Sequence, residues 1–483
     1  MSSKPMNLLF IMSDEHNRQM SGCYGHPHVR TPNIDKLARN GVRFTNAYCN
    51  SPICVPARSA LATGRYVHET GNWDNAAPYH GEVPSWGHRL IEQGHEVVSI
   101  GKLHYRNDSD DNGFSRSVIP LHVVDGVGDV FALVRDNFEP KLSNRKKIED
   151  AGPGESSYTR YDRSICDEAV EFLRQQSDTP DKPWVLFVSF VCPHFPLIAP
   201  QRFYDMYPHD QVVLPKQHCK HERPTHPAIE MYRHISGTRD DFDEASIRKA
   251  LATYYALCSY MDDQVGQVLG ALEQSGLADN TRIIYTSDHG DTMGEHGVWF
   301  KNTMYEGSVT VPMIVAGPDL PKGKVVDTPV SLVDCFPTIV DAVGGQLDVV
   351  DTDLPGRSLL DFAHADEVQE RWVFSEYHAS GSITGTFMIR TNQYKLVHYV
   401  GFDPQLFDLI ADPGELRDLA GDAQYSQVLA SCMKKLREVC SPGAVDRQAK
   451  NSQNSRVAAH GGREAVINGG YTIPFSPVPE QFQ

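Results

Sequence analysis

One stretch of the chain places a reactive side chain next to a guanidinium. It is SPICVPARSALATG, residues 51–64. Pro56 suits the first turn of a helix, where a missing N–H costs nothing, and Gly64 suits the left-handed residue that ends one. The spacing predicts a short helix that begins at about Pro56 and ends before Gly64. Cys54 then lies just ahead of the positive end of this helix, and Arg58, four residues on, lies on the same face.

Four apolar segments, each typical of a strand buried on both faces, end in polar residues that could do chemistry. Because ligands of open α/β sheets bind outside the carboxyl ends of the strands, we expect these polar side chains to meet at one edge. Each alone could be a helix cap, a core histidine or a solvated charge, but two strands that both end in Ser-Asp favour a shared site. The segments and residues are 6–12 with Asp14 and Glu15, 96–100 with Lys102 and His104, 184–191 with His194, and 282–287 with Asp288 and His289.

The strand-end residues include donors for a metal ion. Asp14 and Asp288 offer carboxylate oxygens, and His289 offers a ring nitrogen. Hard oxygen donors favour calcium, magnesium or manganese over zinc. We therefore expect one divalent cation at this edge of the sheet.

The pattern Cys-x-Pro-x-Arg at 54–58, followed by SALATGR at 59–65, resembles the signature of type I sulfatases of the alkaline phosphatase superfamily. In that family the cysteine is oxidised after translation to formylglycine. A buried inert thiol is the ordinary role of a single cysteine, but here the motif and the strand-end residues occur together. The similarity covers most of the chain and is densest over 6–105 and 282–320.

The resemblance implies both a fold and a metal shell. The fold is an alkaline-phosphatase-like α/β sandwich, with a large, mostly parallel sheet flanked by helices and a smaller C-terminal α+β domain with an antiparallel sheet. Asp14, Asp288 and His289 match the family's metal ligands, and oxidised Cys54 completes the shell. Glu15 stands where many sulfatases have a second aspartate, and His289 where many have asparagine. Calcium is the expected ion, with manganese or magnesium as alternatives.

The resemblance also implies an anion site and a reaction. Arg58 and Lys102 hold the formylglycine and the sulfate, His104 contacts the formylglycine hydroxyl, and His194 and Lys301 contact the sulfate and the leaving group. The hydrated aldehyde at position 54 attacks sulfur, and His194, with Lys301, protonates the departing alcohol or phenol. His104 then takes the proton that lets sulfate leave. Cations neutralise the tetrahedral anion, which leaves the histidines for proton transfer.

Alternative functions stay open. Phosphonate monoester and phosphodiester hydrolases of the same superfamily share Cys-x-Pro-x-Arg, but they resemble this chain less at GKLH, 101–104. A non-catalytic anion-binding relative would have lost one of the key residues. A hydrolase that uses the unmodified thiol of Cys54 conflicts with a carboxylate-rich metal site.

The organic part of the substrate is less defined. Choline-sulfatase-like enzymes share the runs SDHGD at 287–291 and WFK at 299–301 and also Asn75, which we expect to contact substrate. A quaternary ammonium would need an aromatic cage and carboxylates, to which Glu376 and Tyr377 could contribute.

Composition limits the class of protein. The 483 residues include 45 basic and 62 acidic side chains, a net charge of −17, which argues against nucleic acid or an anionic membrane as the main partner. Ten cysteines at irregular spacing form neither a disulfide framework nor a paired zinc motif, so reduced thiols are expected. The N-terminus lacks the apolar core of a signal peptide, and no apolar run approaches the roughly 20 residues that span a bilayer. These features predict a cytoplasmic enzyme.

The chain divides into three predicted parts. Residues 1–370 form the catalytic domain, with loop-rich rims at 105–160 and 200–243. Short strands and a helix predict an α+β subdomain over 371–440. Residues 441–483, rich in Gly, Ser, Asn and Pro, read as a tail that packs on a partner subunit or near the active-site mouth. We expect a homo-oligomer that takes a small sulfate ester and is matured by a formylglycine-generating enzyme.

Overall fold

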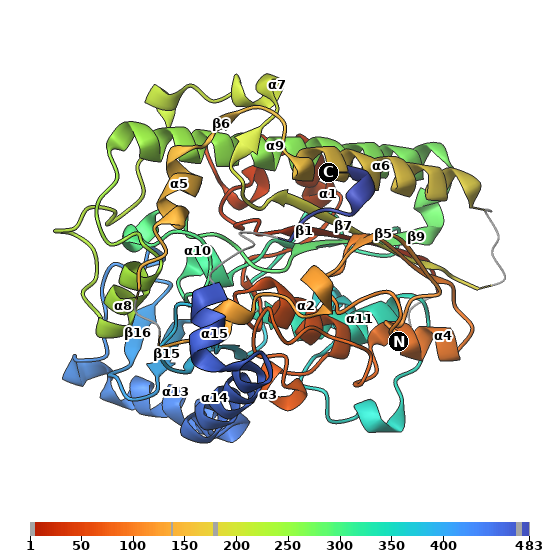
Figure 1. Cartoon of the computed structure of the whole chain (residues 1–483). Helices are drawn as coiled ribbons and strands as arrows, with labels where there is room; N and C mark the ends of the chain where they lie inside the picture. Colours follow the sequence, from red (N-terminus) through yellow and green to blue (C-terminus); the bar gives the residue numbers. More distant parts are fainter. Residues whose placement is uncertain (1–4, 137–138, 177–181, 470–475, 483) are drawn as a thin grey trace.

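An eight-stranded sheet forms the centre of the molecule (Figure 1). The computed structural model describes residues 5–136, 139–176, 182–469 and 476–482. Only β10 of this sheet runs against its neighbours, so the prediction of a mostly parallel sheet is confirmed. The strands lie in the order β11 (Lys324–Val326), β2 (Gly41–Phe44), β10 (Met313–Ala316), β9 (Thr281–Ser287), β1 (Asn7–Asp14), β7 (Val185–Pro193), β4 (Val97–Lys102) and β5 (Arg116–Leu121).

Helices cover both faces of the sheet, as Figure 1 shows. Strand β1 is buried along its whole length, with Leu9 and Ile11 on one face and Leu8 and Phe10 on the other. This explains its unbroken apolar sequence, because alternate side chains enter two different cores. One face packs against α1 (Pro32–Arg39), α6 (Ser157–Gln175) and α9 (Glu244–Gln274), and the other against α2 (Cys54–Thr63), α4 (Trp86–Glu92), α11 (Cys335–Ala342) and α12 (Leu359–His364).

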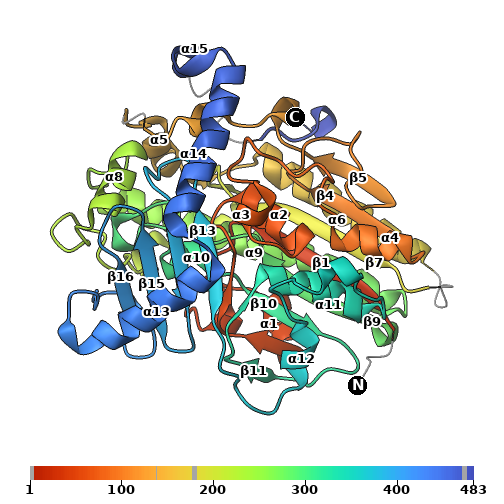
Figure 2. The same cartoon turned by 90° about the horizontal axis from the view of Figure 1, so that it is seen from below.

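A second, antiparallel sheet follows in the C-terminal part (Figure 2). The turn 391–393 joins its two central strands, and the N–H of Thr391 donates to the carbonyl of Tyr394 at 2.9 Å. The four strands and the helix predicted for this region are therefore present. They are β13 (Val373–Tyr377), β14 (Thr386–Arg390), β15 (Tyr394–Tyr399), β16 (Gln405–Asp408) and α13 (Ser426–Val439).

The last part of the chain holds two helices where the sequence suggested a tail. They are α14 (Pro442–Ala459) and α15 (Gly462–Gly469). The polar composition of this region does not suggest a helix. Pro442 nevertheless suits the first turn of α14, and buried residues recur every four positions along it. These are Val445, Ala449, Gln453 and Val457. This region reaches the active-site mouth, one of the two places considered for it, as described below; residues 470–475 and 483 lie outside the described residues.

The two loop-rich rims contain more structure than predicted. The first includes edge strand β5, whose Pro120 is tolerated because an edge strand leaves N–H groups unpaired. The remaining short elements are β3 (Ala47–Tyr48) paired with β12 (Val330–Ser331), β6 (Gly152–Pro153) paired with β8 (Ile198–Ala199), α3 (Val67–Thr70), α5 (Ser143–Glu149), α7 (Gln201–Tyr204), α8 (Pro227–Ile235) and α10 (Glu306–Val309). Within the described ranges, no helix combines the length and apolarity needed to cross a membrane.

Candidate active site

Helix α2 presents Cys54 at its first position, and every residue of this helix is buried. The helix begins two residues before the predicted start and ends, as predicted, at Gly64, whose φ of 67° is left-handed. Its first N–H groups need partners, and Asn75 Oδ1 accepts the N–H of Val55 at 3.2 Å. Asn75 therefore holds the helix start as well as lining the pocket beside Cys54.

Arg58 joins the ends of two neighbouring strands. Its Nε donates to Asp288 Oδ2 at 2.8 Å and its Nη2 to Asp14 Oδ2 at 3.0 Å. Its Nη1 donates to Ser189 Oγ at 2.9 Å and to the carbonyl of Lys102 at 2.8 Å. The Nζ of Lys102 lies 2.5 Å from Asp14 Oδ2. These fully buried cations pair with one oxygen of each carboxylate, so the prediction that the strand ends meet at one edge is confirmed.

The other oxygens of the two carboxylates face a common centre. Asp14 Oδ1 lies 3.7 Å from Cys54 Sγ, and Asp288 Oδ1 lies 3.6 Å from His289 Nε2. His289 Nδ1–H donates to the carbonyl of Gly290 at 3.0 Å, which leaves Nε2 as an acceptor 3.3 Å from Cys54 Sγ. One donor atom from each of these four buried residues lies within 4.8 Å of the others. The group therefore fits a divalent cation, with the histidine tautomer fixed by its backbone contact.

Glu15 faces one lysine and one histidine beside this group. Its Oε2 accepts from Lys301 Nζ at 3.0 Å and lies 3.3 Å from His194 Nε2. Lys301 Nζ also lies 3.3 Å from Cys54 Sγ. Glu15, Asp14 and His194 form a second close group of possible ligand atoms. The role of Glu15 as a metal ligand stays a prediction.

His104 lies at the end of β4 with a φ of 59°. Its Nε2 lies 2.6 Å from Ser476 Oγ in the C-terminal segment, while its buried Nδ1 has no hydrogen-bond partner among the described residues. The carbonyl of Ser476 accepts from Tyr158 Oη at 2.6 Å. The C-terminal segment therefore reaches the catalytic edge.

Burial sets the protonation of the central groups. It raises the pKa of Cys54 to about 12, and Asp14 adds to the shift. That is the opposite of what a thiolate nucleophile requires. Burial also lowers the pKa of His194, with Lys301 adding to the shift, and lowers the pKa of His104, with Lys102 adding to it.

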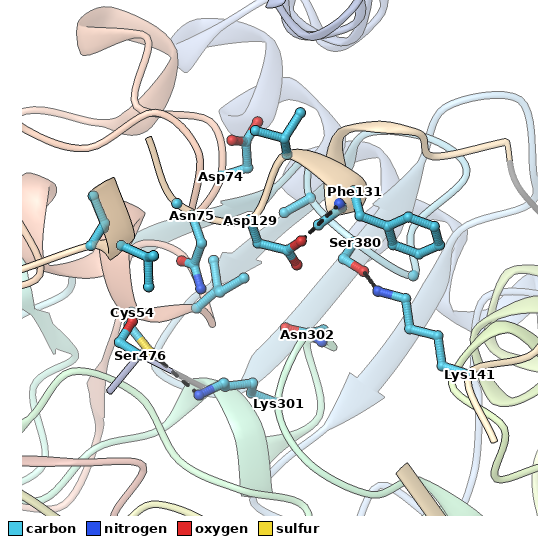
Figure 3. Close-up of a pocket in the computed structure, with 18 of the residues that line it drawn as sticks. Cys54, Asp74, Asn75, Asp129, Phe131, Lys141, Lys301, Asn302, Ser380 and Ser476 are labelled. Atoms are coloured by element: carbon cyan, nitrogen blue, oxygen red, sulfur yellow. Dashed lines mark hydrogen bonds between the residues drawn. The ribbon is translucent and has the colours of Figure 1, made fainter. Parts of the chain in front are cut away.

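The site opens into a cavity of about 540 Å³ (Figure 3). Cys54, Lys102, His104, His194 and Lys301 all line it. The structure thus brings together, around one cavity, every side chain for which the sequence predicted an anion-binding or proton-transfer role, apart from Arg58, which lies behind the carboxylates.

Sequence reasoning missed Asp74, which the C-terminal helix holds beside the pocket. Arg456 Nη1 and Nη2 donate to its two oxygens at 2.9 and 2.8 Å, and Gln453 Nε2 donates to Oδ2 at 3.0 Å. The four-residue spacing of buried positions in α14 could have placed this helix, but no local signal gives the pairing with a residue almost 400 positions away.

Glu376 and Tyr377, the candidates for an aromatic cage, do not line the cavity. Glu376 is fully buried and accepts from His68 Nδ1 at 2.7 Å and from His378 Nε2 at 2.9 Å. Tyr377 Oη donates to the carbonyl of Ser380.

Comparison with known proteins decides the family. Residues 6–345 match the Sulfatase family, and residues 294–441 match the family N-sulphoglucosamine sulphohydrolase, C-terminal. The chain belongs to the sulfatase family. It is a sulfuric ester hydrolase, as predicted.

Two curated relatives align with nearly the whole sulfatase chain. Choline-sulfatase of Rhizobium meliloti (strain 1021) is 31% identical over 99% of this chain and 94% of its own length. Arylsulfatase K of Danio rerio is 31% identical over 91% of this chain and 85% of its own length.

Solved structures confirm the predicted alkaline-phosphatase-like sulfatase fold. A phosphonate monoester hydrolase of Agrobacterium radiobacter superposes with a TM-score of 0.72 at 25% identity, covering 90% of this chain and 95% of that one. A 2-O GAG sulfatase superposes with a TM-score of 0.71 at 25% identity, covering 90% and 92%.

Proposed function

We propose that this sulfatase hydrolyses a sulfate monoester to an alcohol or phenol and inorganic sulfate, with formylglycine at position 54 and one divalent ion, calcium first among the candidates. One observation carries the proposal. Cys54, at the start of a buried helix, faces two carboxylates, a histidine nitrogen and the ammonium of Lys301 in one cavity.

The proposed metal ligands are Asp14, Asp288, His289 and residue 54, with Glu15 as a further candidate. When bound, the ion and the oxidised residue 54 would supply an acidified hydroxyl nucleophile. Arg58 neutralises one oxygen of each aspartate, which would leave the other oxygen of each for the ion. Maturation requires a formylglycine-generating enzyme as partner.

The chain's own cations and histidines do the remaining work. Lys102 and Lys301 bind the sulfate oxygens and stabilise the charge that develops on them. His194, with Lys301, protonates the departing oxygen, and His104 accepts the proton that allows sulfate to leave. Asn75 holds the start of α2 and lines the same wall.

Phosphonate ester hydrolysis is the second candidate, and the superposition on a phosphonate monoester hydrolase favours it. Lys102 and His104 support the sulfate ester, because the resemblance assigns both residues to sulfatases. Lys102 ends β4, His104 follows two residues later, and both line the cavity as that role requires.

An assay panel tests the proposal. The matured protein is given 4-nitrophenyl sulfate, choline sulfate, a sugar sulfate and a phenylphosphonate ester, with Cys54→Ala as the control. We expect sulfate release from at least one ester, faster than phosphonate cleavage, and none from Cys54→Ala, whose far-ultraviolet circular dichroism stays native. A faster phosphonate reaction would select the alternative, and full activity of Cys54→Ala would refute the nucleophile.

A further inference from the structure

The cavity extends past the catalytic edge to a second pair of cations. Lys141, just before α5, and Lys147, within α5, both line it. In Figure 3, Cys54 and Lys301 lie at one end of the pocket, whereas Lys141 lies at the other end with Phe131 and Ser380. Neither lysine belongs to the motifs that define the sulfate site.

One aromatic ring lies between Lys301 and Lys147. The ring centre of Phe195, the residue after His194, lies 5.5 Å from Lys301 Nζ and 4.2 Å from Lys147 Nζ. The lysine that faces Cys54 and the first lysine outside the catalytic edge are therefore neighbours. A substrate with its sulfate at residue 54 places its organic part along this row.

The aromatic faces of the outer pocket already meet the chain's own ammonium groups. Lys147 Nζ lies 5.7 Å from the ring centre of Phe300, and Lys141 Nζ lies 5.2 Å from that of Phe131. Lys141 Nζ also donates to Ser380 Oγ at 3.0 Å. A quaternary ammonium binds to aromatic faces beside carboxylates, so here it would be repelled by the lysine ammonium groups.

The acidic residues of the cavity offset this charge only in part, because the pKa of each lysine stays below its ordinary value. Asp74 is bound by Arg456, and Asp125 lies at the exposed rim. Asp129 lies nearer the lysines and accepts the N–H of Ala132 at 3.2 Å, and burial raises its pKa. Burial lowers the pKa of Lys147 to about 8; Glu15 and Asp129 oppose this shift, whereas Lys141 and Lys301 add to it. An anion between the two outer lysines would reverse that effect.

We propose that Lys141 and Lys147 form a second anion-binding subsite, and that the substrate is a sulfate ester whose organic part carries another anionic group, either a carboxylate or a second sulfate. The proposal rests on the proposed function, because it places the reacting sulfate at residue 54. It also separates this chain from enzymes whose ester has a cationic organic part.

The test uses four aryl sulfates that differ in one meta substituent. The substituents are carboxymethyl, sulfo-oxymethyl, hydroxymethyl and trimethylammoniomethyl, each attached through a methylene that limits its effect on the acidity of the leaving phenol. We expect kcat/KM for the better anionic ester to exceed that for the hydroxymethyl ester by at least about tenfold, as for hydrogen bonds to charged groups. The cationic ester should be the poorest substrate. The ratio of kcat/KM between the two anionic esters shows whether the subsite prefers a carboxylate or a second sulfate.

Variants assign the preference to the lysines. Lys147→Met and Lys141→Met should each bring the anionic-to-neutral ratio of kcat/KM toward one, whereas Lys146→Met, exposed on the same helix, should keep it. Because the ratio is internal to each preparation, partial loss of folded protein does not change it, and melting temperatures check the fold. Equal kcat/KM for all four esters, or an unchanged ratio in both lysine variants, would overturn the subsite. Failure to cleave any of the four by protein with verified formylglycine would instead count against the proposed function.

Discussion

At the scale of single residues, the site depends on one guanidinium that is shared between two strand ends. Arg58 donates to Asp14, Asp288, Ser189 and the carbonyl of Lys102. A lysine has the same charge but lacks the planar fork, so it cannot reach both carboxylates together. The proposed metal shell therefore depends on the geometry of Arg58 as well as on its charge.

We predict that Arg58→Lys lowers kcat/KM for a sulfate ester by about 100-fold or more, because misplaced catalytic groups lose orientation. Metal content, measured by plasma mass spectrometry, should fall in parallel, since Asp14 and Asp288 lose their common anchor. Arg65→Lys, just beyond the same helix and bound to Asp353, is the matched control. Wild-type metal content in Arg58→Lys would contradict this role.

Much of the residue-level site could be predicted from the sequence, because it follows two local rules. Catalytic groups stand at the ends of apolar strands, and Cys54 stands at the start of a helix marked by Pro56 and Gly64. What could not be predicted depends on distant parts of the chain. Asp74 forms an ion pair with Arg456, and His104 lies within hydrogen-bond distance of Ser476. The sequence near Asp74 or His104 contains no signal that identifies these partners.

At the scale of elements, a buried acid joins helix α3 to strand β13. Burial alone would raise the pKa of Glu376, but His68 and His378 outweigh it and lower the pKa to about 2. Burial would lower the pKa of His68, but Glu376 outweighs it and raises the pKa above the ordinary value of 6.5. Glu376 thus stabilises the fold above about pH 4.5, its ordinary value. That contribution is lost as the pH falls toward 2. Charged His68 stabilises the fold below pH 6.5, and its contribution is lost as the pH rises through the raised pKa.

The pair therefore contributes most between these two limits. We predict that Glu376→Gln destabilises the protein by about 2 kcal/mol at pH 6, as for a hydrogen bond to a charged group, and by less at pH 9. Melting temperatures of Glu376→Gln and of the exposed control Glu370→Gln at both pH values measure this. A loss of the same size at pH 6 and pH 9 would show that the charge pair is not the cause.

The same scale shows where sequence patterns fail. Strands β13 to β16 could be predicted because each is short, apolar and bounded by turn residues. Strand β5 was not predicted because it is a half-buried edge strand. Such a strand does not require an unbroken apolar run, and not all of its N–H groups donate to a neighbouring strand. Helix α14 was not predicted because two of its five buried residues, Asp446 and Gln453, are polar, so its core-facing stripe is not wholly apolar.

At the scale of the whole molecule, residues 74–75 and the C-terminal helices, which are far apart in the sequence, line the same cavity. Helix α14 crosses to the catalytic part beside α2 and α3 (Figure 2). There Arg456 binds both oxygens of Asp74, next to Asn75, which in turn holds the first turn of α2. The C-terminal helices thereby help to position Cys54.

We predict that Arg456→Met lowers kcat/KM by about tenfold, because buried Asp74 loses its main partner and small displacements of catalytic groups are costly. The fold should persist, since Gln453 still donates to Asp74. Arg447→Met, exposed on the same helix, should behave as the wild type in the same assay. Equal kcat/KM in both variants would show that this part of the cavity does not depend on this ion pair.

The state of residue 54 is the most direct test of the account. The protein is prepared with and without a formylglycine-generating enzyme, and the peptide that contains position 54 is analysed by mass spectrometry beside the rate of sulfate release. The account predicts that activity rises in proportion to the fraction of peptide with the mass loss of thiol-to-aldehyde conversion. Full activity in protein whose residue 54 is entirely an intact thiol would contradict it.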